Sequence, residues 1–126
     1  IHAALAGQPI RMRDSGEARR SYCYISEAMA LIWLVALSEN TAGEVFNIGN
    51  AHSETSIYGL AEIILDLTGG SGEIIRGEEI NSALTSAPSR VCVSMEKCYQ
   101  YFGFEPTLSL AHGLTRVIEW MRHVSP

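Results

Sequence analysis

The sequence has little of several residue types, and each shortage argues against a class of protein. Its three cysteines, Cys23, Cys92 and Cys98, are irregularly spaced, which predicts reduced thiols and no disulfide framework. It has no run of 18 apolar residues, so we expect no membrane span. Its 9 Lys and Arg against 14 Asp and Glu give a net charge of −5, which argues against a nucleic-acid partner.

Signals for metals and for export are also scarce. The 4 histidines show neither HxxxH nor HExxH spacing, so no metal site is predicted. The sequence starts without Met and without a basic segment leading into an apolar one. We therefore expect a trimmed or partial chain that has no signal peptide and resides in the cytoplasm.

What the sequence does contain is 47% apolar residues, arranged in alternating helical and strand-like patterns. The patterns predict helices over residues 1–6, 26–39, 55–68 and 94–102, and a last helix after residue 109. They predict short strands over residues 9–12, 20–25, 44–48 and 73–76, and a loop over residues 77–90. Because a serine or threonine hydroxyl accepts a first-turn N–H, the predicted N-caps are Ser26, Thr55 or Ser56, Ser94 and Ser109.

These elements predict an α/β fold with short strands and four to five amphipathic helices, forming a single domain over residues 1–126. Several apolar helix faces have no obvious partner within a chain of this length. That surplus predicts a piece of a larger fold, or a homo-oligomer that covers the faces.

Five motifs in a fixed order carry a family resemblance. They are GQPI (7–10), SGEARRSYCYISEAM (15–29), GEVFNIGNAHSETSIYGLAEIILDLTG (43–69), PSRVCVSMEKC (88–98) and FGFEPTLSLAHGLTRVIEWMR (102–122). Together they resemble the C-terminal part of the extended short-chain dehydrogenases/reductases, which are NAD(P)-dependent nucleotide-sugar epimerases, dehydratases and decarboxylases. The resemblance covers nearly the whole chain and implies the small portion of the subunit that holds the nucleotide-sugar.

The family's other half is not recognisable in this sequence. No G-x-x-G-x-x-G or G-x-G-x-x-G occurs, so the turn that cradles a dinucleotide is missing. None of the five tyrosines has Lys four residues later, so the family's catalytic Tyr-x-x-x-Lys is missing too. We expect this chain to bind no cofactor and to be catalytically silent alone, although NAD(P) is implied for a full-length relative.

The resemblance implies three substrate-binding residues. Arg20 and Arg90 match family arginines that reach the diphosphate of a UDP- or dTDP-sugar, and a planar guanidinium suits phosphate oxygens. Met12 lies on the segment that runs beside the nucleotide base in relatives. The alternatives are a surface charge or ion pair for each arginine and an ordinary strand contact for Met12. Arg19 is expected to face solvent.

The chain departs from the family pattern at the segment beside the base and before one helix. Relatives often carry an aromatic residue and a glycine where this sequence has Arg13 and Asp14. Many carry Asp where it has Ser94, which keeps a capping oxygen and removes a charge.

A function of a different class stays open. The chain could be a non-catalytic interaction or oligomerisation module that kept the fold and lost the ligand, or a partner that completes a separate dinucleotide-binding chain. The sugar, the base and the parent reaction, whether isomerase or lyase, also stay open.

Overall fold

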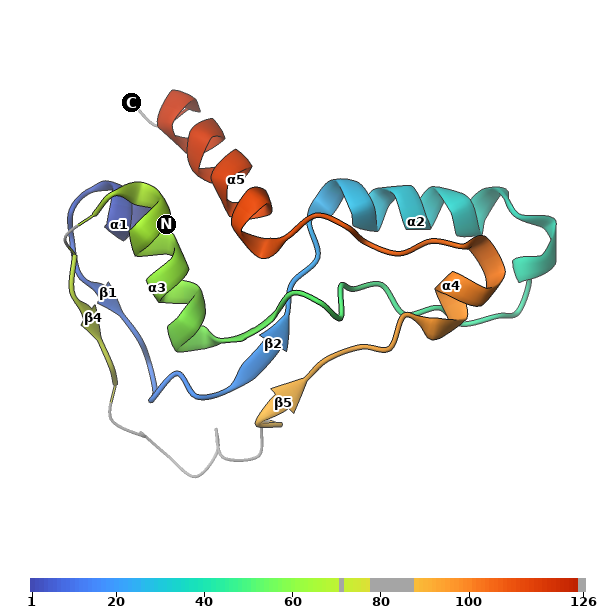
Figure 1. Ribbon diagram of the computed structural model, residues 1–126, viewed down its shortest axis with the longest axis horizontal. Coiled ribbons are helices and arrows are strands. Elements are labelled where there is room, and N and C mark those ends of the chain that lie inside the picture. Colours follow the sequence, from blue (N-terminus) through green and yellow to red (C-terminus); the bar gives the residue numbers. More distant parts are fainter. Residues whose placement is uncertain (71, 78–87, 125–126) are drawn as a thin grey trace. The chain divides into compact units, whose positions relative to one another are not determined.

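Short strands and five α-helices alternate along the residues that the computed structural model describes, which are 1–70, 72–77 and 88–124 (Figure 1). The α/β fold class is therefore confirmed. The chain divides into two compact units. Unit 1 comprises Ile1–Arg20, Thr55–Val91 and Ala111–Pro126, and unit 2 comprises Ser21–Glu54 and Cys92–Leu110. The expectation of one domain over residues 1–126 stays a prediction.

Unit 1 contains one pair of strands and most of a second small sheet, in which Ser21 and Glu54 already belong to unit 2. β1 (Ile10–Arg11) pairs in parallel with β4 (Ile74–Ile75). β2 (Arg19–Ser21) is the central strand of a second sheet, with order β3-β2-β5, in which β3 is Glu54–Ser56 and β5 is Arg90–Val91. The predicted strands at residues 9–12, 20–25 and 73–76 are thus present but shorter than expected.

Three helices complete unit 1: α1 (His2–Leu5), α3 (Ile57–Thr68) and α5 (Leu110–Val124, which starts at the unit boundary). α1 packs against α3. Apolar side chains at helical spacing form the buried interior, namely Ala4, Ala61, Ile64, Ile118 and Met121. A further link joins α5 to the end of α3, where Arg122 Nη2 donates to the carbonyl oxygen of Thr68 at 3.3 Å.

Both ends of α3 lie where the sequence pattern predicts them. Ser56 is the N-cap, and its hydroxyl accepts the Gly59 N–H at 2.9 Å, which confirms one of the two predicted capping residues. Gly69 ends the helix in the left-handed conformation, at φ 67°, which glycine adopts without a steric penalty. Both ends of α3 are therefore fixed by short local signals.

Unit 2 is built on α2 (Ile25–Leu37) and α4 (Glu96–Phe102), with a short 3₁₀ turn, η1, at Glu39–Thr41. Leu31, Met95 and Cys98 form its buried centre, and partly buried apolar side chains surround them: Val35, Phe46, Val93, Phe102 and Phe104. The Thr41 hydroxyl donates to the Val35 carbonyl oxygen at 2.8 Å, in addition to the Ser38 N–H that this carbonyl accepts at the end of α2.

Two predicted N-caps are wrong in position. The N-cap of α2 is Tyr24, whose carbonyl oxygen accepts the Glu27 and Ala28 N–H groups, so Ser26 lies inside the first turn. The N-cap of α4 is Met95, although the hydroxyl of the preceding Ser94 accepts the Glu96 N–H at 3.4 Å. In each case the helix is placed one or two residues away from the serine that the pattern favoured.

The predicted strand at residues 44–48 is also wrong. That segment has no strand assignment, and side chains of α4 occupy two of its carbonyl oxygens. Lys97 Nζ donates to the Val45 oxygen at 2.9 Å, and Cys98 Sγ donates to the Asn47 oxygen at 3.2 Å. The alternating pattern that suggested a strand instead turns Phe46 toward the buried centre.

Candidate functional site

Arg20 and Arg90 lie on neighbouring strands of unit 1, although they are far apart in the sequence. β2 and β5 pair in parallel, with Arg19 opposite Arg90 and Arg20 opposite Val91. The Arg19 N–H donates to the Ser89 carbonyl oxygen at 2.8 Å. The structure thus brings the two predicted diphosphate-binding residues to adjacent strands, one register position apart.

The register also decides which arginines share a face of the sheet. Successive residues of a strand point to opposite faces, and residues in register on adjacent strands point to the same face. Arg19 and Arg90 therefore share one face, where both are exposed. Arg20 belongs to the other face; it is half-buried, and its Nη1 donates to the carbonyl oxygen of Arg19 at 2.6 Å.

Met12 follows β1 and is half-buried inside unit 1. Its N–H donates to the Ile75 carbonyl oxygen at 2.9 Å, which extends the pairing of β1 with β4 by one residue. Its side chain lies over Gly16, because a Cβ added to that glycine would collide with the Met12 Cε. This is the strand contact that the sequence left open, and contact with a nucleotide base stays a prediction.

Arg76, which lies directly after β4, had no predicted role. Its Cζ sits 3.9 Å from the centroid of the Tyr58 ring, and its Nη1 donates to Glu17 Oε1 at 2.8 Å. A cation on an aromatic face and an exposed ion pair are each worth about 1 kcal/mol or less. The only hint in the sequence was an arginine at the end of a predicted strand.

A hollow of about 850 Å³ lies between α3 and β4 in unit 1. Three carboxylates line it, those of Glu62, Asp66 and Glu73. Negative lining repels a phosphate, so this hollow does not suit the ligand that the arginines would bind. The arginine-bearing strands are the better candidate site.

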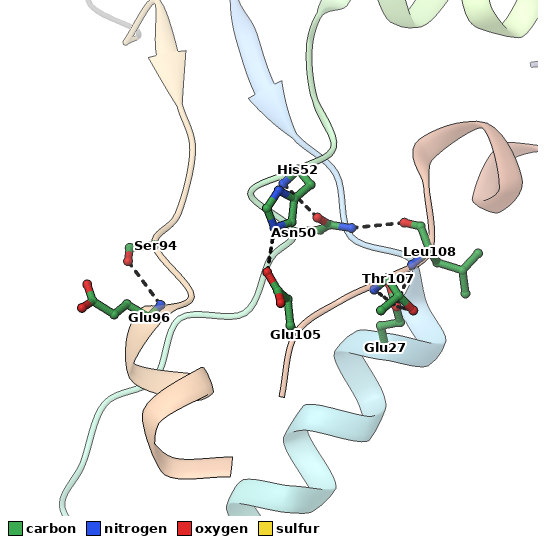
Figure 2. A network of polar contacts seen from close by, with 8 residues as sticks. All are labelled: Glu27, Asn50, His52, Ser94, Glu96, Glu105, Thr107 and Leu108. Atoms are coloured by element: carbon green, nitrogen blue, oxygen red, sulfur yellow. Dashed lines mark hydrogen bonds and ion pairs between the residues drawn. The ribbon is translucent and has the colours of Figure 1, made fainter. Parts of the chain in front are cut away.

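Unit 2 carries a separate network of polar contacts, shown in Figure 2. His52 Nε2 and Glu105 Oε1 are 2.8 Å apart. The buried Asn50 donates to the Leu108 carbonyl oxygen at 3.1 Å and accepts the His52 N–H at 3.0 Å. Glu27 Oε1 accepts the N–H groups of Thr107, at 2.6 Å, and Leu108, at 2.9 Å. These contacts join segments of unit 2 that are distant in the sequence, and their role is structural.

Cys23 and Cys98 show no sign of nucleophilic chemistry. Burial raises the pKa of the Cys98 thiol, and burial together with the nearby Glu27 carboxylate raises that of Cys23. Within residues 1–70, 72–77 and 88–124, no three His, Cys, Asp or Glu side chains gather into a metal-binding group. No helix in the same ranges is long and apolar enough to cross a membrane.

Known proteins match this chain along nearly its whole length. The model of the NAD dependent epimerase/dehydratase family matches residues 1–49. UDP-glucuronic acid decarboxylase 1 of Xenopus tropicalis is 32% identical over 97% of this chain and 27% of its own length. The resemblance to extended short-chain dehydrogenases/reductases is confirmed.

Solved epimerases and their relatives share the fold. The Thermotoga maritima UDP-glucose 4-epimerase, solved with UDP-glucose, has a TM-score of 0.83 and 24% identity over 98% of this chain and 38% of that one. A Bordetella bronchiseptica enzyme, solved with NAD⁺ and UDP, has a TM-score of 0.77 and 28% identity over 97% of this chain and 34% of that one. The chain spans 27% and 39% of the length of the first two curated relatives.

The cofactor that the family implies finds no cradle in the described residues. A dinucleotide pyrophosphate normally meets a glycine-rich turn ahead of a helix N-terminus. Among the described residues, Gly7, Gly69 and Gly103 have positive φ but each follows a helix, and Gly16 and Gly43, also with positive φ, do not directly precede one. The residues directly ahead of α2, α3 and α4 are Tyr24, Ser56 and Met95. This part of the epimerase/dehydratase fold therefore does not fit NAD.

Proposed function

We propose that the chain is the substrate-binding portion of an NAD(P)-dependent nucleotide-sugar epimerase or dehydratase. Arg20 and Arg90 would bind the diphosphate of a UDP- or dTDP-sugar, and the segment around Met12 would run beside the base. The observation that carries the proposal is the β2–β5 pairing, which puts both arginines on adjacent strands, one register position apart, although their side chains leave opposite faces of the pair. The Bordetella enzyme solved with UDP lends support, since it shares the fold at 28% identity.

The proposed chemistry is binding without turnover. Guanidinium groups offer paired N–H donors to phosphate oxygens, and a diphosphate presents several such oxygens at short spacing. The sequence holds neither the glycine-rich dinucleotide turn nor a Tyr-x-x-x-Lys, so hydride transfer would need residues from outside it. We therefore expect ligand affinity but no epimerase, dehydratase or decarboxylase activity from this chain alone.

Calorimetric titration with UDP-glucose, dTDP-glucose and UDP tests the proposal. Replacing Arg20 or Arg90 by alanine should weaken binding by about 1–3 kcal/mol, the value of a charge-assisted hydrogen bond. Arg116→Ala is the matched control, because Arg116 is an exposed arginine of unit 1 on α5. A folded wild-type chain that binds none of the three ligands would refute the proposal.

The surface of α2 supports a second candidate function, an interaction or oligomerisation module. Ile25, Trp33 and Leu37 are 65%, 59% and 77% exposed, an unusual load of apolar surface for one helix. A second copy of the chain is the proposed occupant, since such faces associate with like faces in symmetric dimers. Sedimentation should show a dimer that Trp33→Glu dissociates and that Trp120→Glu, on α5, leaves intact. A monomeric wild-type chain would exclude this module.

A further inference from the structure

Unit 2 contains a hollow of about 420 Å³ beside the end of α2, and it shares no lining residue with the proposed diphosphate site. Two short segments line it, residues 38–41 of the turn after α2 and residues 100–102 at the end of α4. Its volume lies in the range of about 300–1,000 Å³ that is usual for small-molecule sites. The hollow is therefore large enough for a ligand of its own.

The polar groups of this hollow are hydroxyl, amide and carboxylate groups. Within the described ranges, the side chains of Glu39 and Asn40 make no hydrogen bond or ion pair, and both residues are exposed. Gln100 Nε2 donates to Glu96 Oε1 at 3.3 Å, which leaves the Gln100 amide oxygen as an acceptor. Planar amide and carboxylate groups of this kind pair with neighbouring hydroxyl groups of one ligand.

An aromatic ring supplies an apolar surface in the same hollow. Tyr101 is 46% exposed, and its ring meets the Phe46 ring edge to face, with centroids 5.1 Å apart and 83° between the planes. The Lys97 ammonium lies 5.7 Å from the Tyr101 ring centroid. Because these contacts hold the ring before a ligand arrives, stacking on it costs little conformational entropy.

We propose that this hollow binds a neutral sugar, with the Tyr101 ring against the C–H face of a pyranose and with Glu39 and Asn40 hydrogen-bonded to its hydroxyl groups. A pyranose combines an apolar face with hydroxyls that both donate and accept, which is the chemistry that the lining offers. Among the lining residues only Glu39 is charged, and its negative charge favours a neutral ligand over a phosphate or a sugar acid. The site needs neither the arginines nor a nucleotide, so it is independent of the proposed function.

Titration with D-glucose, followed through the backbone amide signals in NMR spectra, tests the site. The amides of residues 38–41 and 100–102 should shift with a dissociation constant of about 1 mM, as expected for so small a ligand. Asn40→Ala should weaken binding about 2- to 10-fold through the loss of a neutral hydrogen bond. Gln8→Ala, which removes an exposed amide from unit 1, is the matched control and should leave the affinity unchanged.

Two further comparisons test the aromatic part of the site. Tyr101→Leu should weaken glucose binding about 2- to 10-fold. Tyr99→Leu should not, because Tyr99 is an exposed tyrosine of the same helix that does not line the hollow. Sorbitol, which carries hydroxyl groups but has no pyranose ring, should bind more weakly than glucose. Circular dichroism of each variant confirms that lost affinity is not lost folding.

The outcomes separate this site from the proposed function. No amide shift of a folded chain at about 100 mM glucose would overturn the site, because that concentration saturates a millimolar site. Shifts confined to residues 19–20 and 90 would also overturn it, since the sugar would then lie on the strands of the proposed function. Equal affinities of the Tyr101 and Tyr99 variants, or of sorbitol and glucose, would overturn the assignment to a sugar. If glucose shifts residues 38–41 and 100–102 while UDP shifts nothing, the sugar site stands and the proposed function fails.

Discussion

Replacing Glu27 by alanine should destabilise unit 2 by an amount that can be estimated from its contacts. Its Oε1 accepts two backbone N–H groups, from Thr107 at 2.6 Å and Leu108 at 2.9 Å (Figure 2). Hydrogen bonds to a charged group are worth about 1.5–3 kcal/mol each. The other oxygen, Oε2, is buried and has no partner among the described residues, which offsets part of that gain. We expect a net loss of about 2–4 kcal/mol.

The matched control is Glu96→Ala. Glu96 is also an acidic first-turn residue of a helix in unit 2, so both variants lose the same helix-dipole interaction of about 0.3–1 kcal/mol. Of these two glutamates, only Glu27 also accepts the N–H groups of a loop distant in the sequence, those of Thr107 and Leu108. Glu27→Gln, which keeps an acceptor oxygen without the charge, should fall between the alanine variant and the wild type.

Urea unfolding followed by Trp33 fluorescence measures the effect, because this tryptophan lies on α2 and a Trp120→Phe background removes the other signal. Hydrogen exchange at the Thr107 and Leu108 amides gives a local reading, and both should exchange faster in Glu27→Ala. If the Glu27 and Glu96 alanine variants lose equal stability and exchange at those two amides is unchanged, Glu27 does not stabilise unit 2 through the Thr107 and Leu108 N–H groups.

Three further predictions concern packing. Leu31→Ala should cost about 3–5 kcal/mol of unfolding free energy in urea denaturation, because Leu31 is fully buried at the centre of unit 2. Gly16→Ala should lower the melting temperature, since Gly16 has φ 75° and an added Cβ would collide with the Met12 side chain. Cys98 should react with a thiol reagent at pH 8 far more slowly than Cys92, because Cys98 is buried and its pKa is raised by that burial.

Each of these has a contradicting result. A Leu31→Val variant that loses as much stability as Leu31→Ala would mean that cavity size is not the cause. A neutral Gly16→Ala variant would mean that Met12 does not lie over that glycine. Equal labelling rates of Cys98 and Cys92, read by mass spectrometry of the native protein, would place both thiols at the surface.

Sequence patterns predicted the elements best where a local signal ends a helix. Gly69 and Gly103 stop α3 and α4 in the left-handed conformation, and both ends are where the sequence put them. Ser56 caps α3 because its hydroxyl reaches a backbone N–H only three residues away. Because such contacts join residues only a few positions apart, they can be predicted from the local sequence pattern.

Contacts between residues far apart in the sequence could not be predicted from local patterns. The segment at 44–48 alternates like a strand, but Lys97 and Cys98, about fifty residues later, bind its carbonyl oxygens. The motif order brought Arg20 and Arg90 into one hypothesis, but a motif cannot reveal strand register. A shift of one residue exchanges the two faces of a strand, and that single step makes Arg19 the neighbour of Arg90.

The way the chain alternates between its units bears on how the protein is made. Unit 1 draws on three separate segments and unit 2 on two, so neither is a continuous stretch of sequence. Synthesis at about 5–20 residues per second delivers α5 only after every segment of unit 2 has emerged. Ile118 and Met121 belong to that late helix, so the interior of unit 1 stays open to water until then. A ribosome stalled before α5 should therefore present a nascent chain that chaperones bind and proteases cut within unit 1.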